Sequence, residues 1–548
     1  MKERIPERKS EARDEPQMKK YRDLRDHLRA LESENLLQRV TRPINKDTEL
    51  FPLVRWQFRG GLTENQRKGW FFENVVDSNG KKYVHPFALG VLASSRQIYA
   101  VGLECRDDRE ILDKWQRALS DPVAPVMVGD GPVQEVVLDQ STLAHTDKGF
   151  DSMPVPISTP GFDNGPYFTW SHWVTKDPET GVRNIGNYRS QLKSRTRLGI
   201  SLGAAQHAVI HWRKCRAKGI PLEAAIIVGC PPVVSYACVQ KVPYGQDEYE
   251  VAGGLAREPI QLVKCKTVDL EVPADAEMVI EGRLPTDFLE PEGPFGESHG
   301  YMHPRQLSPF MDVTCVTMRK DMILTGIMSQ VTPSESSTIK KVGYDTLFLR
   351  HLQVDCGLTN VVRVVMHEAL VNLRKLVILQ VKKSSKEQIQ KALRAAATFH
   401  GGVGKITIAV DEDIDPENLN GLFWALCFRA TFPNDIEFLP EMSHGHAPPF
   451  PKEDILTRPD AVGKESYMLV DATLKEPFPP VSLPRRDIME KAADIWRELK
   501  LPELKPEYPW FGYSLGDWTE ENQHEAELAL TGRHYEIGAK LEQFRVKR

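Results

Sequence analysis

Short apolar runs divided by glycine and proline fill the middle of the chain, and they constrain its fold more than any other feature. Between residues 131 and 330 they include VQEVVLD, AAIIVG, AEMVIEGRL and FMDVTCVTMRKDMILTGI. Runs of this length, rich in β-branched residues and bounded by turn residues, are typical of strands in a barrel or a sandwich. One longer segment at 198–219, LGISLGAAQHAVIHWRKCRAKG, predicts a helix inserted between the strands.

The segments on either side of this region alternate between helical and strand-like patterns. In YRDLRDHLRALESENLL, the residues Leu24, Leu28 and Leu31 share one helical face. Beyond residue 331, RKLVILQV is followed by SSKEQIQKALRAAATFH, in which Ser384 and Glu387 predict a capping box, and then by KITIAV. Such alternation is typical of α/β structure.

These patterns predict four parts in a mixed α/β (α+β) protein of 548 residues, a length that exceeds a single core. We expect an N-terminal α/β domain at 1–130, a β-rich domain at 131–330, a second α/β domain at 331–480 and a helical extension at 481–548. The extension either contacts a neighbouring subunit or packs on its own chain.

The charge and cysteine content disfavour several classes of protein. The 71 basic and 76 acidic residues give a net charge of −5, with no concentrated basic patch, so we expect no nucleic-acid partner. The eight cysteines contain no C-x-x-C pair, which disfavours a disulfide framework or a thiolate zinc site. No segment approaches the roughly 18 apolar residues of a membrane span, and the charged N-terminus is unlike a secretory signal. We therefore expect a soluble, cytoplasmic protein with no membrane partner.

Three polar side chains in the β-rich part form a candidate metal set. Asn184, His207 and Glu248 offer an amide oxygen, an imidazole and a carboxylate. This mixture suits Mn²⁺ or Mg²⁺ bridging to a phosphate better than structural Zn²⁺. His207 and His211 are also four residues apart on the expected helix, which can chelate a metal but lacks the glutamate of the zinc-protease motif. We expect His211 to pack within the protein instead.

The segment LEPEGPFGESHGY at 289–301 holds two glutamates, Glu292 and Glu297, around a Gly-Pro-Phe-Gly core. The glycines and the proline exclude a regular helix, and in a straight strand an odd separation would send the two side chains to opposite faces. A turn is therefore required if both carboxylates are to reach one cavity. The alternative is a solvated surface turn that carries two charges.

Four motifs together resemble the signature series of the UbiD family, which comprises reversible decarboxylases that use prenylated FMN. They are N-I-G-N-Y-R at 184–189, Gln206 with His207, D-E-Y-x-x-A-G-G-L around Glu248, and E-G-P-F-G-E at 292–297. Their order and spacing match over residues 160–305, and S-S-T-I-K-K-V-G-Y and G-V-G-K extend the similarity to residue 440. The resemblance implies a central split β-barrel flavin-binding domain between N- and C-terminal α/β domains. It also implies a homodimer or homohexamer that receives its cofactor from a flavin prenyltransferase.

The resemblance also implies roles for individual residues. Asn184, His207 and Glu248 match the ligands of a divalent ion, usually Mn²⁺ (or Mg²⁺), that holds the flavin phosphate, with K⁺ nearby. The positions that match flavin-lining residues, the metal ligands included, are Thr169, Asn184, Ile185, Tyr188, Arg189, Gln206, His207, Glu248 and Lys405. One departure is CVQK at 238–241, where the family carries a small, serine-rich loop beside the flavin.

By the same resemblance, Arg189, Glu292 and Glu297 match a catalytic Arg-Glu-Glu triad in which Glu297 is the proton donor. Loss of CO₂ from an unsaturated carbon requires an electron sink, which no side chain supplies and a cofactor must. The carbon must then be protonated, and we expect Arg189 to keep one glutamate ionised while the other holds a proton. The two carboxylates therefore form a coupled pair, and the sequence does not decide which of them is protonated.

The sequence leaves the substrate and some alternatives open. The main hypothesis is decarboxylation of an aromatic or heteroaromatic acid through a covalent prenylated-FMN adduct, with a CoA thioester such as phthaloyl-CoA as a variant. One alternative is a metal hydrolase built on His207, His211 and Glu248. Another is a non-catalytic flavin-binding paralogue, which the intact triad disfavours.

Overall fold

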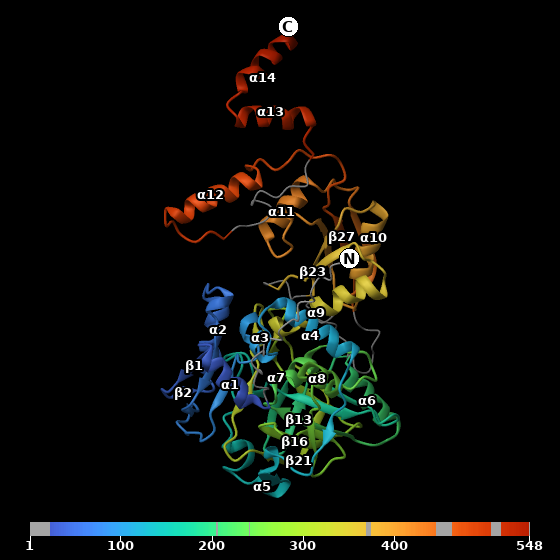
Figure 1. Cartoon of the computed structure of the whole chain (residues 1–548). Coiled ribbons are helices and arrows are strands. Elements are labelled where there is room, and N and C mark those ends of the chain that lie inside the picture. Colours follow the sequence, from blue (N-terminus) through green and yellow to red (C-terminus); the bar gives the residue numbers. More distant parts are fainter. Residues whose placement is uncertain are drawn as a thin grey trace, which may run out of the picture. The chain divides into compact units, whose positions relative to one another are not determined.

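The computed structural model describes residues 22–203, 206–240, 242–368, 374–444, 463–505 and 517–546. These residues form two compact units (Figure 1). The first unit runs to Gly343 and the second begins at Tyr344. Both contain helices and strands, so the predicted mixed α/β fold class is confirmed. The four-part division predicted from the sequence is finer than this one and stays a prediction.

The first unit is built on a large antiparallel sheet with the order β10-β9-β13-β16-β21-β12-β11-β8, and β7 pairs with β21 beside this path. The predicted β-rich texture of residues 131–330 is therefore present as one curled sheet. Its strands are β7 (Val136–Asp139), β8 (Tyr167–Phe168), β9 (His172–Lys176), β10 (Arg183–Asn187), β11 (Ser190–Ser194), β12 (Arg197–Ile200), β13 (Leu222–Val228), β16 (Met278–Leu284) and β21 (Phe310–Met318).

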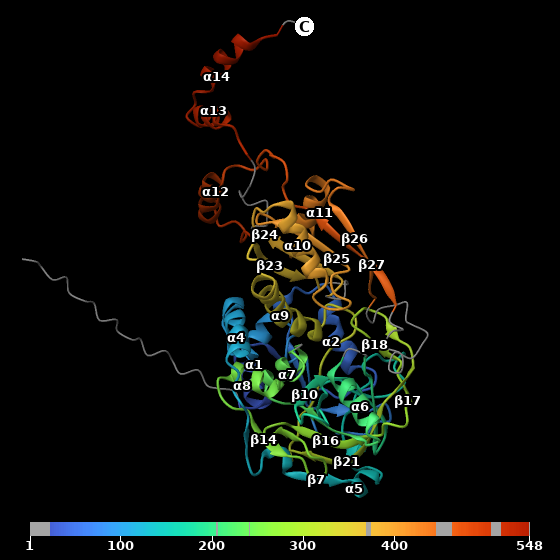
Figure 2. The same cartoon turned by 90° about the vertical axis from the view of Figure 1, so that its right-hand side faces the viewer.

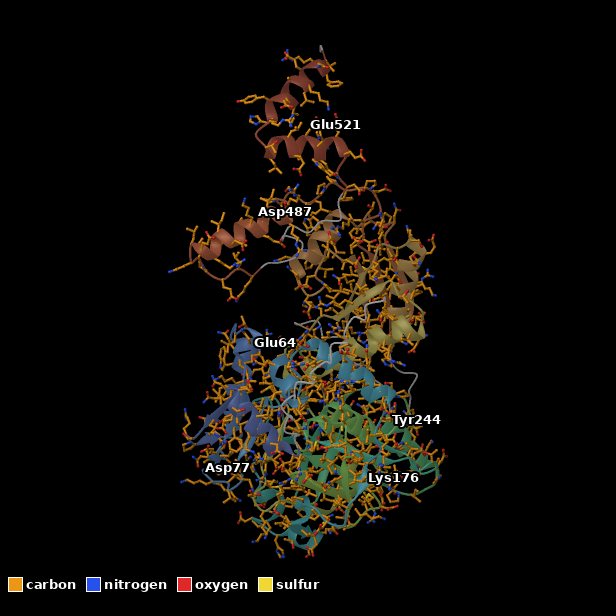
Figure 3. All side chains as sticks on the ribbon, viewed as in Figure 1. Glu64, Asp77, Lys176, Tyr244, Asp487 and Glu521 are labelled. Carbon is orange, nitrogen blue, oxygen red and sulfur yellow. The ribbon has the colours of Figure 1, made fainter. Side chains whose placement is uncertain are left out.

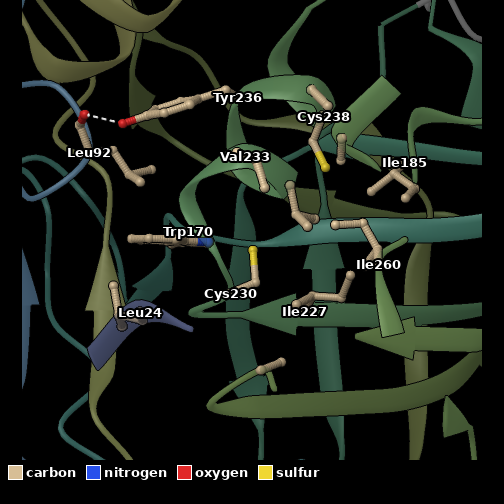
Figure 4. Packing of buried hydrophobic residues seen from close by; sticks show 14 of the residues in the cluster. Leu24, Leu92, Trp170, Ile185, Ile227, Cys230, Val233, Tyr236, Cys238 and Ile260 are labelled. Carbon is tan, nitrogen blue, oxygen red and sulfur yellow. Dashed lines mark hydrogen bonds between the residues drawn. The ribbon is translucent and has the colours of Figure 1, made fainter. Parts of the chain in front are cut away.

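Strand β13 explains why the run AAIIV is apolar without interruption. Its residues alternate between two hydrophobic cores: Ala225 and Ile227 enter one, whereas Ala224, Ile226 and Val228 enter the other. Successive side chains of a strand point to opposite faces, so a strand covered on both faces must be apolar at every position. Figure 4 shows the first of these cores, which contains Ile227, Ile185 and Trp170, and in which Tyr236 donates a hydrogen bond to the Leu92 carbonyl.

A close helix–helix contact accounts for the paired glycines of the A-G-G motif. Helix α8 (Glu248–Ala256) packs on α4 (Asp108–Ser120). A Cβ on Gly254 would lie 2.8 Å from Ala118 Cα, and one on Gly253 would lie 2.4 Å from the Val123 carbonyl oxygen. A larger residue at position 254 would push α8 away from α4, and one at position 253 would clash with the backbone that follows α4. Helix α8 begins at a candidate metal ligand.

Two predicted helices are shorter in the structure. The helix expected at 198–219 was wrong in its first part, because residues up to Ile200 belong to β12, which pairs with β11 and β21. Helix α6 covers only His207–Ala217. Helix α1 (Leu24–Ser33) also ends early, since Asn35 adopts a left-handed conformation with φ of 55°. Tertiary pairing overrides local helical pattern in the first case.

The rest of the first unit surrounds the large sheet. A four-stranded sheet has the order β1-β3-β5-β22, so a strand from residues 324–326 joins strands from the first 90 residues. Further helices and short strands of this unit are α2 (Leu50–Arg59), α3 (Arg96–Gly102), α5 (Gln140–Ala144), α7 (Pro232–Val239), β1 (Leu37–Val40), β2 (Ile44–Asn45), β3 (Gly69–Phe72), β4 (Val75–Val76), β5 (Phe87–Leu89), β6 (Val126–Met127), β14 (Gln261–Lys264), β15 (Glu271–Pro273) and β22 (Leu324–Gly326).

The second unit contains a five-stranded sheet with the order β23-β24-β25-β27-β26, and Figure 2 shows α10 and α11 beside it. The predicted capping box exists one residue later than expected: Ser385 caps α10 and Gln388 completes the box, rather than Ser384 and Glu387. The elements are β23 (Val361–Met366), β24 (Leu376–Val381), β25 (Ile406–Asp411), β26 (Ile436–Ser443), β27 (Lys464–Asp471), α10 (Lys386–Ala397) and α11 (Leu419–Phe428). Helix α9 (Glu335–Arg350) contains the boundary between the units.

The predicted C-terminal helices are present as α12 (Arg486–Glu498), α13 (Glu520–Leu530) and α14 (His534–Leu541). None of the three has a buried residue, and Figure 3 shows Asp487 on α12 and Glu521 on α13 among their side chains. Among the residues that the structure describes, no helix is long and apolar enough to cross a membrane.

Candidate active site

Arg189 lies between β10 and β11 and holds both glutamates of the 289–301 segment. Its Nε donates to Glu292 Oε1 at 2.9 Å and its Nη2 donates to Glu292 Oε2 at 2.7 Å, while Nη1 donates to Glu297 Oε1. Arg189 is 9% exposed and Glu292 is 0% exposed. Bidentate pairs of this kind fix orientation as well as charge. Burial alone would lower the pKa of Arg189, but the two carboxylates raise it above its usual value.

The glutamates meet on one arginine because their segment is an offset hairpin. Strand β17 (Glu290–Glu292) pairs with β20 (Gln306–Ser308), and β18 (Phe295–Gly296) pairs with β19 (Met302–His303). Between β17 and β18 the chain turns at Gly293, whose φ is +90°, and at Pro294. The structure therefore contains the turn that the glycines and proline predict. The Glu297 N–H donates to the Tyr301 carbonyl at 3.0 Å, which anchors the second carboxylate at the tip.

Two aromatic residues complete this cluster, and the sequence did not single them out. The Phe295 ring lies 4.9 Å from the Arg189 guanidinium carbon and 4.4 Å from the Tyr167 ring. The Tyr167 hydroxyl donates to Glu292 Oε1 at 3.2 Å. Burial and the adjacent Glu292 raise the pKa of Tyr167, so its hydroxyl stays a donor. The only available signal was the proximity of Tyr167 to Thr169 along the chain.

Asp163 is a further titratable group beside the arginine. Its Oδ2 accepts the Thr159 N–H at 2.7 Å. Burial raises the pKa of Asp163 to about 6, although backbone hydrogen bonds and the charge of Arg189 act in the opposite direction. The region around Arg189 therefore contains three carboxyl groups and one cation.

The three candidate metal ligands converge on the Asn184–Ile185 step of β10. Asn184 Oδ1 lies 3.0 Å from His207 Nδ1, and Glu248 Oε2 accepts the Ile185 N–H at 2.8 Å. Asn184 Nδ2 is buried, with no hydrogen-bond partner among the described residues. Burial raises the pKa of Glu248 to about 8, and a cation bound beside the carboxyl group would favour its charged form. This oxygen-rich set fits Mn²⁺ or Mg²⁺.

The neighbouring histidine has a different environment. His211 Nδ1 lies 2.9 Å from Thr175 Oγ1, and burial lowers the pKa of His211 to about 4. The Tyr244 ring, labelled in Figure 3, stands edge-on to His207 and packs on His211 as well. Among the described residues no three His, Cys, Asp or Glu side chains are grouped as metal ligands. His211 contacts Thr175 and Tyr244, in agreement with the expectation that it packs within the protein.

The other expected flavin-lining residues fall in both units. Thr169 Oγ1 accepts the Ile327 N–H at 3.0 Å, and Gln206 Oε1 accepts the Gly203 N–H at 2.8 Å. Ile185 is buried, and Tyr188 lies so close to Gly186 that a Cβ there would be 2.3 Å from the hydroxyl.

Lys405 belongs to the second unit, where its ammonium pairs with Glu465. Its side chain is 45% exposed. In the CVQK segment, Cys238 is buried on α7, whereas Lys241 lies outside the described residues. The structure thus brings the first unit's candidates together on β10 and its neighbours and leaves Lys405 on a separate unit.

Comparison with protein families gives two adjoining matches. The 3-octaprenyl-4-hydroxybenzoate carboxy-lyase Rift-related domain matches residues 126–331, and the C-terminal domain of the same carboxy-lyase matches residues 339–454. Together they cover more than half of the chain. Both matches include segments that the sequence motifs had indicated.

Solved structures give the same result. HmfF from Pelotomaculum thermopropionicum, a UbiD-class enzyme solved with FMN, is 28% identical, with a TM-score of 0.73 over 86% of this chain and 99% of that chain. An evolved dimeric form of HmfF was solved with prFMN, at a TM-score of 0.71 and 27% identity over 85% of this chain and 97% of that chain. Vanillic acid decarboxylase from Sedimentibacter hydroxybenzoicus, in closed form, is 28% identical, with a TM-score of 0.73 over 88% and 99% of the two chains.

A curated relative has a matching activity in its name. Phenolic acid decarboxylase from Bacillus subtilis is 28% identical over 434 residues, which are 77% of this chain and 88% of the relative. The curled sheet, the Arg-Glu-Glu cluster and these matches define a carboxy-lyase. The chain belongs to the UbiD family of decarboxylases.

Proposed function

We propose that the protein catalyses the reversible, non-oxidative decarboxylation of an aromatic or heteroaromatic carboxylic acid with prenylated FMN bound in the first unit. The observation that carries the proposal is the contact of one buried arginine, Arg189, with both Glu292 and Glu297. A structural ion pair needs only one carboxylate, whereas protonation of a carbon needs a carboxyl group that can gain and lose a proton.

The environments of the two glutamates suggest their division of work. Glu292 is fully buried and accepts two hydrogen bonds from Arg189 and one from Tyr167, which fix the orientation of its side chain. Glu297 takes one hydrogen bond from Arg189, and its side chain is 34% exposed. We therefore assign proton delivery to Glu297, and Glu292 with Tyr167 to the positioning of Arg189. By microscopic reversibility, Glu297 removes the same proton in carboxylation.

Asn184, His207 and Glu248 would hold Mn²⁺ (or Mg²⁺) at the flavin phosphate, with K⁺ nearby. Oxygen ligands with one imidazole suit these ions. Ile185, Tyr188, Thr169, Gln206 and, from the second unit, Lys405 are the proposed flavin-lining residues. When bound, the flavin supplies the electron sink that loss of CO₂ requires.

The substrate class follows from the named relatives, one of which is a vanillic acid decarboxylase and another a phenolic acid decarboxylase. We take a free aromatic acid as the substrate in preference to a CoA thioester such as phthaloyl-CoA. We also infer that the protein works as a homodimer or homohexamer and receives its cofactor from a flavin prenyltransferase.

The test is purification without oxygen from cells that also express a flavin prenyltransferase, followed by absorbance and mass measurements of the bound cofactor. We expect a flavin heavier than FMN by a dimethylallyl unit, together with Mn²⁺, and CO₂ release from at least one aromatic acid or CoA ester in a panel. Bound metal without flavin would overturn the proposal in favour of a hydrolase. Bound prenylated flavin without CO₂ release from any acid would indicate the non-catalytic paralogue.

A further inference from the structure

Arg55, on helix α2, carries a positive charge that no carboxylate balances among the described residues. Its guanidinium donates to Gln330 Oε1 and, at 3.4 Å, to the Val331 carbonyl, and both acceptors are neutral. Burial, followed by the nearby charge of Arg59, lowers the pKa of Arg55 to about 10. The group stays charged at neutral pH, but its surroundings disfavour that charge. An anion placed beside it would remove this penalty.

Gln330 provides a second, independent sign of a ligand. It is 4% exposed and adopts a left-handed conformation with φ of +67°, which few non-glycine residues adopt. A guanidinium has donors only, so the amide oxygen of Gln330 must face Arg55. The amide Nε2 therefore points elsewhere, and it has no hydrogen-bond partner among the residues that the structure describes. A buried amide donor in that state requires an acceptor from a ligand or from water.

Gln330 and Val331, which accept from Arg55, lie directly beside the hairpin that carries Glu297. A Cβ on Gly296 would lie 2.6 Å from Gln330 Cγ, and one on Gly300 would lie 3.6 Å from Val331 Cγ2. The Thr159 hydroxyl, 3.1 Å from the same Gly296 position, is also buried with no partner in the described part of the chain. Two polar atoms without a partner among the described residues, Gln330 Nε2 and Thr159 Oγ1, thus lie near Gly296, the residue before Glu297.

We propose that Arg55 and the Gln330 amide bind a carboxylate group of the substrate, an inference that rests on the proposed function. A planar guanidinium and an adjacent amide N–H match the two oxygens of a carboxylate. The carboxylate has two possible sources: the group lost as CO₂, or a second acidic group that the product retains. Ordered water is the alternative occupant, since it too satisfies buried donors.

The experiment is calorimetric titration of the holoprotein with benzoate, phthalate, isophthalate and terephthalate, so that binding is measured without turnover. Arg55→Gln removes the charge but keeps the length of the side chain. Arg59→Gln is the matched control, because Arg59 lies one turn later on α2, is exposed, and donates to the Thr332 carbonyl. Gln330→Glu is a second variant, in which a built-in carboxylate would neutralise Arg55.

We expect wild-type protein and Arg59→Gln to bind at least one of these anions, and Arg55→Gln to bind it roughly 10- to 100-fold more weakly. Gln330→Glu should lose binding without a lower melting temperature, which separates loss of the site from misfolding. Equal weakening for benzoate and the dicarboxylates assigns Arg55 to the departing carboxylate. Weakening confined to a dicarboxylate assigns it to the retained one.

Unchanged affinity of Arg55→Gln for every anion would overturn the inference, as would a wild-type protein that binds none of them saturably. Flavin content and CO₂ release are measured on the same preparations. Arg55-dependent binding in a protein that releases no CO₂ would therefore contradict the proposed function but support the anion site. CO₂ release without Arg55-dependent binding would support the proposed function and contradict the anion site.

Discussion

At the scale of single residues, the site depends on the donors of one guanidinium. Arg189 makes three hydrogen bonds to two carboxylates, a geometry that the single ammonium of a lysine does not reproduce. The sequence predicted that Glu292 and Glu297 would meet through a turn, because glycine and proline fix the chain direction locally. It did not indicate Tyr167 or Phe295, since an aromatic residue that packs on an arginine has the same pattern as one that fills a core.

Glu297→Gln should lower decarboxylation by at least ~100-fold, because an amide cannot donate and recover a proton as a carboxylic acid does. The bound flavin should be unchanged, since Glu297 is remote in the chain from the candidate metal ligands. Initial rates of CO₂ release and the flavin absorbance of the same samples measure both effects.

The matched control is Glu290→Gln, two residues before Glu292. Glu290 pairs with Lys193 and Arg197 near the surface, and such pairs contribute little. This variant should keep most of its activity. Equal losses in the two variants would show that the hairpin tolerates no change, and would contradict the assignment of proton delivery to Glu297.

At the scale of elements, the sequence predicts those strands and helices whose burial follows their own periodicity. The apolar stripe of α1 and the run that became β13 belong to this class. The segment at 198–219 was misread because Leu198 and Gly199 satisfy their backbone groups on β11 and β21. The partner β21 is more than 100 residues away, so no local pattern reveals that pairing.

Helix α1 contains a pH-sensitive contact. His27 is fully buried and its Nε2 lies 2.7 Å from the Val91 carbonyl oxygen. Burial lowers the pKa of His27 to about 4, below its ordinary value of 6.5. The unfolded chain therefore binds a proton between these values and the folded chain does not. Stability from this residue is complete above pH 6.5 and is lost as the pH falls toward 4.

We expect His27→Gln to reduce the acid dependence of the free energy of unfolding by up to about 1.4 kcal/mol per pH unit in this window. Urea denaturation at a series of pH values gives the slope for each protein. His145→Gln, at an exposed position of the same unit, is the control and should keep the wild-type slope. The same slope in His27→Gln and wild type would contradict a buried neutral histidine.

At the scale of the whole molecule, the two units differ in what the sequence revealed. Strand β22 joins the sheet of β1, β3 and β5, so part of the middle region completes the N-terminal sheet, and composition alone cannot show such an exchange. The C-terminal helices were predicted correctly because their 3.6-residue pattern is local. The sequence did not predict what these helices contact. On α12, the exposed residues Ile488, Ile495 and Leu499 lie along one face.

If this face of α12 contacts a second copy of the chain, Ile495→Glu combined with Leu499→Glu should shift the protein from oligomer to monomer. A buried charge in an apolar interface is strongly unfavourable, whereas the helix itself tolerates glutamate well. Light scattering coupled to size-exclusion chromatography measures the mass directly.

Arg497→Glu tests whether added negative charge alone has the same effect. Arg497 lies on the opposite face of α12 and pairs with Asp494, one turn away. The oligomer should survive this change. A wild-type protein that is already monomeric, or a double variant of unchanged mass, would show that α12 does not form the subunit contact.

The continuity of β10 with Arg189 sets a length scale for whatever the site accepts. Asn184 lies on β10 and Arg189 lies five residues later, between β10 and β11, so at ~3.3 Å per residue their Cα atoms are at most about 16 Å apart. This stretch of backbone thus separates Asn184, a proposed metal ligand, from Arg189, which holds the two proposed acid–base glutamates. Inserting or deleting one residue between Asn184 and Arg189 would change the length of this segment and turn one of the two side chains to the opposite face.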